Sequence, residues 1–566
     1  MTEHVHFLGT DWRQVPTTDG SDLRVHHGPG PADTAALAGW LRRGCPGFAP
    51  ISQGFVAVLV DRDGSVIAAG SSRLELALLY AVVDGRLLVA THPRDIACGL
   101  PAKPALNLQK LADLMALYDD PATTVFEGID RLPIGHRLTW HRGWSRPQVS
   151  RWFRPLEMDP LRIKPAEAPA LMRETVHEAV RASLPRSGDV AATLSGGLDS
   201  SMVVGTAASI LAPQGRTVHC VTHRPLPGTP DPRPGWIADD GPDAEAMCRE
   251  VDGTTWTGLR NDALATPFEI VQADFELSWS PSLNPMNAVW MTQAIDFATS
   301  VSSPVLLTGA TGNGPFSRGR GGILRDLPLR DRFEAARRQV PVRARAGERL
   351  GRAALGVAKE SAPLWAQRLR HAHRRGRVVD PRFQDLMPFG SLPPSAAAQA
   401  RLAEMDAGLP PREAWLQLVL RDAFVAMVGQ YRRPDVWFSD PLSDQRVSAL
   451  ALTLPVEAWF AGGRDRGLAR EAAEGLVPDR IRLRTTRGAQ SADAPQWRQG
   501  RRDDYRAEVE RLRASASARS IVDLDEAATS LDKGFDSPTG SWEVTHGRAL
   551  GLAAFALWWE SKISPR

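Results

Sequence analysis

Lysine is scarce in this chain. Only six of its 566 residues are lysines, and none lies between Lys359 and Lys533, whereas arginine occurs throughout. A cationic side chain that binds an anion in that interval must therefore be an arginine, whose planar guanidinium group can contact two phosphate or carboxylate oxygens at once. The net charge of only +3 gives no reason by itself to expect a nucleic acid as partner.

Cysteine is rare as well, with four residues at positions 45, 98, 220 and 248. They form no CxxC motif and no cluster with histidine, which argues against a structural zinc site and against a disulfide scaffold. The sequence also lacks a long apolar run and a basic start followed by an apolar stretch. We therefore expect a soluble, cytoplasmic protein without stable membrane insertion.

The first part of the chain has the pattern of β-hairpins. Short apolar runs between residues 54 and 97 alternate with turn signals such as Asp84-Gly85, and another hairpin is expected to end near Trp152. Prolines at 155, 160, 165 and 169 then mark a boundary. The sequence predicts a β-rich domain over residues 1–155 and a second domain over residues 156–566.

The second part has the order strand, loop, helix, strand that is typical of a parallel α/β sheet. Ligands of such sheets collect at the carboxyl ends of the strands. From about Arg412 the pattern is mainly helical. Helices are predicted over residues 166–184 and 201–211, and short buried strands over residues 190–194, 217–222 and 304–308.

The loop after the first of these strands carries a candidate phosphate site. Its glycines allow backbone N–H groups to approach an anion, its serine hydroxyls add donors, and the start of the next helix contributes partial positive charge. Asp199 is a candidate ligand for Mg²⁺ beside the phosphates. The eight candidate binding residues are Leu194, Ser195, Gly196, Gly197, Leu198, Asp199, Ser200 and Ser201.

The Ser-Gly-Gly-Leu-Asp-Ser-Ser string resembles the pyrophosphate loop of the asparagine synthetase family, whose members cleave ATP between the α- and β-phosphates. Residues 126–136 are similar to the family's Gly-Ile-x-x-Leu-x-Pro-Gly-His signature, and residues 73–90 to the preceding hairpins. The resemblance implies a mixed α+β and α/β fold. An amidotransferase-like (Ntn-type) β-sandwich would precede an adenylating α/β domain with a mainly helical carboxyl-terminal part, and ATP and Mg²⁺ are the implied cofactors.

Glutamine hydrolysis is not expected of the amino-terminal domain. Active amidotransferases of this kind carry a nucleophilic cysteine directly after the initiator methionine, but here this position is Thr2 and the first cysteine is Cys45. A threonine nucleophile would need its own α-amine as base, and therefore removal of Met1. The resemblance thus implies a degenerate amidotransferase-like domain, and ammonia is not the expected nucleophile.

Two further loops of the family act on the phosphates. The resemblance puts Asn313 where relatives carry an acidic magnesium ligand, and an amide carbonyl ligates Mg²⁺ more weakly than a carboxylate does. In place of the family's phosphate-contacting lysine the chain offers Arg484 and Arg487, of which we favour Arg487. The residues expected near the adenosine are Thr222, His223 and Gly309.

Three segments together resemble one branch of the family, the lasso-peptide cyclases or macrolactam synthetases. They are residues 487–490, the loop with Asn313, and residues 439–444. These enzymes adenylate an Asp or Glu side chain of a precursor peptide, and the peptide's amino-terminal amine then closes an isopeptide ring. The resemblance implies a precursor peptide, a leader-binding protein and a leader peptidase as partners. The amine has a pKa of about 7.7–8.0, so only a modest base is needed; the candidates are Tyr431, Asp435, Asp440 and Asp444.

Other functions remain open from the sequence alone. A small-molecule amide or β-lactam synthetase would share the adenylating site and differ in its substrate. A non-catalytic scaffold that binds a nucleotide or a peptide would be expected to have a ruined phosphate loop, but residues 195–201 are intact. The basic segment 318–377, with seventeen Lys or Arg against five Asp or Glu, suits a solvated insertion or an acidic-peptide surface, and its few aromatics argue against nucleic acid.

Overall fold

A computed structural model describes residues 4–73, 75–264, 267–319, 390–400, 435–535 and 546–562. Tyr431, Thr2 and residues 320–377 of the basic segment lie outside these ranges. Among the helices of the described residues, none combines the length and the apolar character that a bilayer crossing requires.

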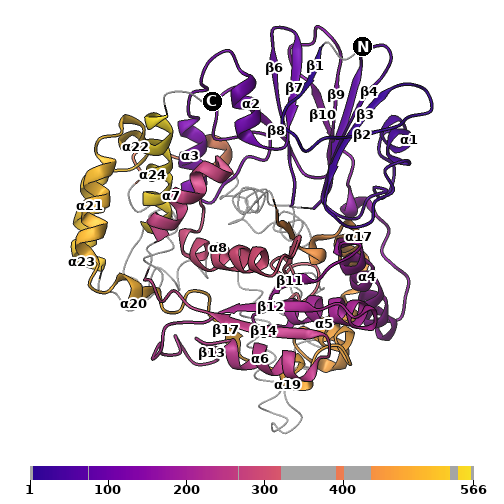
Figure 1. Ribbon diagram of the computed structural model, residues 1–566, viewed down its shortest axis with the longest axis vertical. Coiled ribbons are helices and arrows are strands. Elements are labelled where there is room, and N and C mark those ends of the chain that lie inside the picture. Colours follow the sequence, from indigo (N-terminus) through magenta and orange to yellow (C-terminus); the bar gives the residue numbers. More distant parts are fainter. Residues whose placement is uncertain are drawn as a thin grey trace.

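The amino-terminal part of the chain folds into two β-sheets, which lie at the top of Figure 1. One is antiparallel, with the strand order β10-β9-β5-β4-β3-β2, and the other has the order β1-β7-β6-β8, in which only β1 and β7 are parallel. The strands are β1 (Val5–Phe7), β2 (Arg13–Val15), β3 (Asp22–His27), β4 (Phe55–Val60), β5 (Val66–Gly70), β6 (Leu78–Val83), β7 (Arg86–Ala90), β8 (Asp130–Leu132), β9 (His136–Trp140) and β10 (Gln148–Arg151).

Burial on both sides explains why β4 has no polar residue. Val56 and Val58 of β4 pack into one core with Leu78 and Leu87 of the second sheet, whereas Phe55 lies in another core with α1 (Leu37–Arg42). Successive side chains of a strand point to opposite faces, so a strand covered on both faces reads as a continuous apolar run. The hairpins predicted between residues 54 and 97 are confirmed as β4–β5 and β6–β7.

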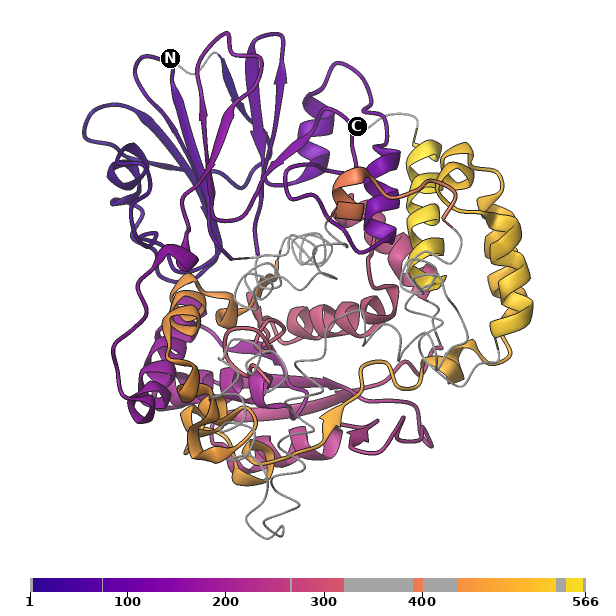
Figure 2. The same cartoon turned by 180° about the vertical axis from the view of Figure 1, so that it is seen from behind.

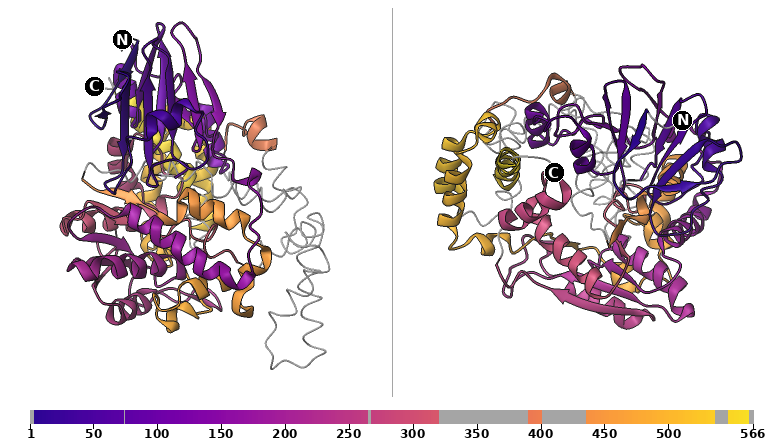
Figure 3. Two further views of the ribbon diagram at one scale, coloured as in Figure 1. Left: turned by 90° about the vertical axis from the view of Figure 1, so that its right-hand side faces the viewer. Right: turned by 45° about the horizontal axis from the view of Figure 1, so that its top comes forward.

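The second part contains a five-stranded sheet in the order β14-β12-β11-β15-β16, and all four of its strand pairings are parallel. The sheet lies at the bottom of Figure 1, below the sandwich, and Figure 3 shows the same stacking from the side. Its strands are β11 (Val190–Thr193), β12 (Val218–His223), β14 (Thr254–Leu259), β15 (Val305–Leu307) and β16 (Trp437–Ser439). The structure therefore confirms the predicted fold class.

Helices cover both faces of this parallel sheet. Helix α8 packs on one face, where Met291 and Ile295 contact Ala191 and Leu306. The opposite face is covered by α4, α5, α6 and α17. The bounds of these helices are α4 (Ala168–Ser183), α5 (Leu198–Leu211), α6 (Gly241–Glu250), α8 (Pro285–Ser300) and α17 (Gln445–Thr453). Helix α5 begins three residues before the predicted start, because Gly197 is already its N-cap.

The carboxyl-terminal helices do not pack on the parallel sheet. Together with α7 they join α2, α3 and the outer face of the four-stranded sheet in one core, in which Phe126 contacts Phe555 and Trp559. Figure 2 shows these helices, in yellow, beside the sandwich. The carboxyl-terminal helices are α21 (Arg502–Leu512), α22 (Ala516–Ile521), α23 (Leu524–Gly534) and α24 (Arg548–Ser561). The other helices of this core are α2 (Pro93–Gly99), α3 (Leu108–Met115) and α7 (Pro267–Ser278). This core joins residues from both sides of the predicted boundary at 155.

Candidate functional site

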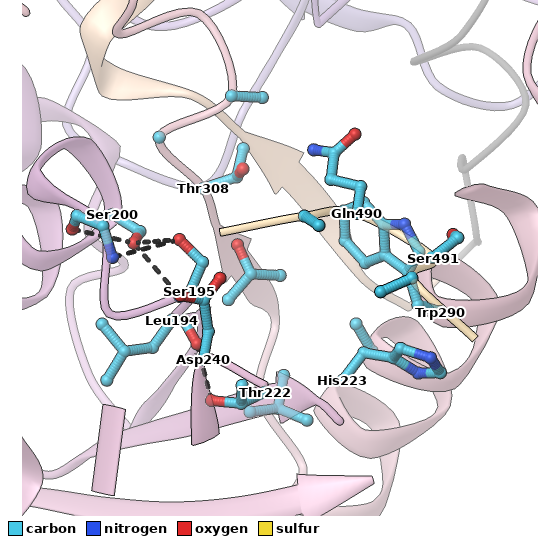
Figure 4. Close-up of a pocket in the computed structure, with 18 of the residues that line it drawn as sticks. Leu194, Ser195, Ser200, Thr222, His223, Asp240, Trp290, Thr308, Gln490 and Ser491 are labelled. Atoms are coloured by element: carbon cyan, nitrogen blue, oxygen red, sulfur yellow. Dashed lines mark hydrogen bonds between the residues drawn. The ribbon is translucent and has the colours of Figure 1, made fainter. Parts of the chain in front are cut away.

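A cleft of about 230 Å³ opens at the carboxyl ends of β11, β12 and β15. Figure 4 shows the residues of the phosphate loop at one end of this cleft and an aromatic group at the other. Gly196, Leu198 and Ser201 are not part of the lining; Leu198 and Ser201 are buried. The predicted residues that line the cleft are Leu194, Ser195, Gly197, Asp199, Ser200, Thr222, His223, Gly309 and Asn313.

The phosphate loop has a shape that only glycine allows at position 196. Gly196 has a φ of +60°, and a Cβ atom there would lie 2.8 Å from Cβ of Asp243. Ser195 is held at the turn because its backbone N–H donates to Oγ of Ser200 at 3.2 Å and its own Oγ accepts from Gly197 N at 3.3 Å. The loop thus presents hydroxyls and the start of the 14-residue helix α5 to the cleft, which is a suitable setting for an anion.

Asp199 lies in the first turn of α5 and is half-buried at the floor of the cleft. Burial raises the pKa of its carboxyl to about 6, against the opposing effects of a hydrogen bond from Ser317 and the charge of Arg466. Within the described structure its Oδ1 atom has no hydrogen-bond partner. A buried carboxylate oxygen without a donor is expensive unless a cation or another donor satisfies it, so this atom is a ready ligand for a cation.

The loop after β15 packs directly against Asp199. A Cβ atom on Gly309 would lie 2.8 Å from the carbonyl carbon of Asp199, and one on Gly312 would lie 2.6 Å from its Cγ. Asn313 also lines the cleft, but its Oδ1 accepts a hydrogen bond of 3.0 Å from Nη2 of Arg466. The sequence prediction had missed Arg466, which follows a glycine pair and has left-handed backbone angles.

The two predicted arginines occupy different positions. Arg484 donates from Nη1 to Asp240 at 3.1 Å and to Asp243 at 2.7 Å, beside the phosphate loop. Asp240 lines the cleft, and burial raises its pKa to about 6 although Arg484 opposes the shift. Arg487 is exposed on the short strand β17 (Arg487–Gly488), which pairs with β13 (Trp236–Ile237), and it does not line the cleft.

The far end of the cleft presents two hydrogen-bond acceptors. The amide nitrogen of Gln293 donates to the Arg260 carbonyl at 2.9 Å, so its oxygen faces Nδ1 of His223 at 3.2 Å and Nδ1 must carry the proton. Burial lowers the pKa of His223 despite the charge of Asp493, which keeps the ring neutral and leaves Nε2 as an acceptor. Nε2 of His223 and Oδ1 of Asp493 are both buried without a partner among the described residues.

The side chain of Trp290, from α8, lies next to His223 in the cleft. An indole face beside two acceptors suits a flat heterocycle that carries an amino group. Trp290, Asp493 and Gln490 were not predicted as site residues, because they come from a helix face and a loop far apart in the sequence.

None of the three described base candidates lines the cleft. Asp440 is fully buried, caps the 3₁₀ turn Pro441–Ser443, and accepts from Thr311 N at 2.8 Å. Asp444 caps α17 and pairs with Arg446 at 3.0 Å. Asp435 is exposed and lines another cavity, beside β3 of the sandwich. Tyr431 lies outside the described residues.

Comparisons with known proteins match one family profile and two curated relatives. A profile described as asparagine synthase matches residues 171–560. "Amidase chyE" of Penicillium rubens is 28% identical over 252 residues, which are 43% of this chain and 36% of that protein. "Amidase chry2" of Gibberella zeae is 30% identical over 167 residues, 28% of this chain and 23% of that protein. The alignments thus span about a third and a quarter of the lengths of these two relatives.

The parallel sheet with its glycine- and serine-rich loop defines a nucleotide-binding α/β domain. Because the profile covers more than half of the chain, this protein belongs to the asparagine synthase family. The domain of that family uses ATP to form amide bonds.

Proposed function

We propose that this protein is an ATP-dependent peptide macrolactam synthetase of the lasso-peptide cyclase type. It adenylates the side-chain carboxylate of an Asp or Glu in a precursor peptide, and the peptide's amino-terminal amine then attacks the activated acyl carbon. One pyrophosphate and one AMP leave, and one isopeptide bond forms. The observation that supports this most directly is the cleft that joins the phosphate loop at Ser195 to the unpartnered carboxylate oxygen of Asp199.

The residues around Asp199 fit a magnesium ion. The buried Oδ1 of Asp199 would be its protein ligand, whereas Asn313 would offer an oxygen that already accepts from Arg466. When bound, the ion would neutralise charge on the phosphates. The N–H groups and hydroxyls of residues 195–200 hold the phosphates in place. Arg466, which contacts Asn313, and Arg484, which contacts Asp240 and Asp243, add guanidinium groups beside the loop.

The proposed nucleophile is a peptide amine and not ammonia. Cys45, the cysteine that follows α1 in the sandwich, is buried. Burial raises the pKa of the Cys45 thiol to about 12, so it stays protonated and unreactive at neutral pH. A peptide amine, with a pKa of about 7.7–8.0, is by contrast partly neutral at the same pH and can attack an acyl-adenylate directly.

The proposed reaction implies further partners. The reacting amine exists only after a leader has been removed from the precursor, so a leader peptidase must act first and a leader-binding protein would deliver the precursor. A precursor that keeps its leader is therefore expected to give no ring.

Mass spectrometry of the peptide product tests the proposal. The enzyme is incubated with ATP, Mg²⁺ and acidic peptides with a free amino terminus, and the peptide is examined for the loss of one water and for a link between its amino terminus and an Asp or Glu side chain. Such a ring is the expected result. AMP formed only with a small carboxylate would favour a small-molecule amide or β-lactam synthetase, and nucleotide binding without turnover would favour a scaffold.

The same incubation separates ligation from amide hydrolysis, the activity named in both relatives. Amide hydrolysis needs no ATP, so cleavage of an amide substrate without ATP would contradict the proposal.

A further inference from the structure

A buried ion pair lies where the amino-terminal sandwich meets the parallel sheet. Arg73 and Glu75, which lie between β5 and β6 of the sandwich, contact each other, and each side chain is only 1% exposed. Two buried charges are costly unless hydrogen bonds satisfy them, and the bonds that do so here come largely from the second domain. The ion pair therefore belongs to the interface between the two parts of the chain.

Glu75 binds the end of strand β16. Its Oε1 accepts from the backbone N–H of Asp440 at 2.8 Å and from Oγ of Ser439 at 3.0 Å. Its Oε2 accepts from the backbone N–H of Gly54, in its own domain, at 2.9 Å. Nη2 of Arg73 donates to the same Ser439 hydroxyl at 3.2 Å. The carboxylate of Glu75 thus ties the sandwich to Asp440, the residue that directly follows β16.

Asp440 connects this ion pair to the phosphate site. Its Oδ2 accepts from the backbone N–H of Thr311 at 2.8 Å, and its Oδ1 accepts from Leu442 N at 3.1 Å. Thr311 stands in the loop whose glycines touch Asp199 and whose Asn313 lines the cleft. A continuous series of short hydrogen bonds therefore runs from Glu75, through Asp440 and Thr311, to the wall of the cleft.

We propose that Glu75 is a positioning residue for the adenylation site. From the amino-terminal domain it fixes Asp440 and, through Thr311, the loop that carries Asn313 against Asp199. The inference rests on the proposed function only in calling this an adenylation site. The positioning of the loop at Thr311 by Glu75 and Asp440 would affect nucleotide and metal binding whatever the acyl substrate is. It gives the degenerate amidotransferase-like domain a role in catalysis that needs no nucleophile. A displacement of about 1 Å in such a loop is enough to cost about 10²-fold in rate.

The same domain provides a matched control. Lys110 and Arg131 form a second buried group with Asp119, whose side chain is 2% exposed, and these contacts stay within the sandwich domain. Asp119→Asn should destabilise the fold, because it removes one partner of a buried ion pair. It should leave the loop at Thr311 unchanged. Any effect that Asp119→Asn shares with the Glu75 variants is therefore one of stability alone.

The variants are Glu75→Ala, Glu75→Gln and the double variant Arg73→Met with Glu75→Leu. Glu75→Ala leaves a buried guanidinium without its partner and can fail to fold, whereas apolar replacement of both members of a buried pair is often tolerated. Glu75→Gln keeps an oxygen that can accept from Asp440 N and Ser439. The double variant therefore separates stability from positioning, and Glu75→Gln is the conservative rescue.

The first measurement is direct binding of a non-hydrolysable ATP analogue by titration calorimetry at several Mg²⁺ concentrations, which needs no peptide and holds even if the substrate proposed above is wrong. The double variant should unfold at a temperature close to that of the wild type, yet require about 10-fold more Mg²⁺ for half-maximal analogue binding, the loss expected when a group that orients a metal ligand is removed. Glu75→Gln should stay near the wild type, and Asp119→Asn should bind normally.

The rate of AMP formation gives a second reading once a substrate is known. The double variant should lose about 10²-fold in kcat with little change in KM for the peptide. Wild-type Mg²⁺ dependence in the folded double variant, or an equal loss in Asp119→Asn, would overturn the proposal.

Discussion

At the scale of single residues, Asp199 is the centre of the account. It combines a raised pKa, a buried oxygen without a hydrogen-bond partner in the described structure, and a place in the first turn of the helix behind the phosphate loop. Asp199→Ala should lower AMP formation by about 10³-fold, since the metal contributes several kcal/mol of charge stabilisation. The check is a comparison of AMP release with the wild type at saturating Mg²⁺. Unchanged turnover would remove the metal assignment.

From His223 and Asp493 we predict that the cleft prefers adenine to guanine. Adenine presents an amino group where guanine presents a carbonyl oxygen, and the two unpartnered acceptors at this end of the cleft suit the amino group. GTP should bind about 10- to 100-fold more weakly than ATP, because its oxygen would leave buried acceptors unpaired. Competition of each nucleotide against a fluorescent ATP analogue measures the ratio. Asp493→Asn, which supplies an N–H donor, should reduce the preference for ATP over GTP. An unchanged ratio of the two affinities would exclude a role of Asp493 in recognising the adenine amino group.

Asp440 predicts how stability depends on pH. Burial raises the pKa of its carboxyl to about 7 in the folded protein, well above the ordinary value for an aspartate. The folded state therefore binds a proton that the unfolded state has released, and this contribution to stability is complete below about pH 4 and lost as the pH rises through about 7. Asp440→Asn should flatten the free energy of unfolding over that interval by up to about 1.4 kcal/mol per pH unit. Denaturant titrations of the wild type and of Asp440→Asn at pH 5, 6 and 7 test this. The same change of unfolding free energy with pH in both proteins would contradict it.

At the scale of elements, the shape of the phosphate loop depends on its contact with α6. Gly196 has left-handed backbone angles, and its Cα faces Asp243 of α6. Gly196→Ala adds a Cβ atom at 2.8 Å from that residue, so the loop must shift. We expect the substitution to lower the free energy of unfolding by about 1–3 kcal/mol through backbone strain. We also expect the affinity for nucleotide to fall by about 10-fold or more, because the displaced loop no longer fits the phosphates. Gly64→Ala, also at a positive φ but with nothing within 4 Å, is the matched control for backbone strain alone.

Elements with a strong local pattern could be predicted from the sequence. The strand at 190–193, the loop at 194–201 and the hairpins of the sandwich follow from apolar runs and from glycine and serine positions, which act over a few residues. Arg466 and Asp493 could not be found in this way. Arg466 contacts Asn313 and Asp493 lines the cleft, but both come from loops more than 260 residues beyond the phosphate loop, where their neighbours in the sequence give no signal.

The different surroundings of the two candidate arginines could not be read from the sequence either. Arg484 and Arg487 have similar neighbours in the sequence, and Arg487 was favoured by resemblance to the family's lysine position. In the structure Arg484 lies beside Asp240, whereas Arg487 is exposed on β17, which pairs with β13. Strand pairing over 250 residues of sequence separation is a tertiary effect that no local pattern encodes.

At the scale of the whole molecule, the two parts of the chain share cores and do not meet at a simple surface. The carboxyl-terminal helix α24 packs with α3 and the four-stranded sheet, and Phe126 contacts Trp559 with ring centroids 4.6 Å apart. Residues 156–566 expressed alone should therefore expose a large apolar face and fail to fold cooperatively. Calorimetry of that fragment is the test. A sharp unfolding transition at the temperature of the full chain would show that the sandwich is dispensable.

The central claim concerns which bond of ATP is broken. A phosphate loop of this family that activates a carboxylate as an acyl-adenylate must release AMP and pyrophosphate, whereas activation as an acyl phosphate would release ADP and phosphate. The most direct measurement is ³¹P NMR of the products formed from ATP by the full chain with an acidic peptide and Mg²⁺. We predict AMP and pyrophosphate in equal amounts, formed only when the peptide is present and lost in Asp199→Ala. ADP and phosphate as the products would contradict the account.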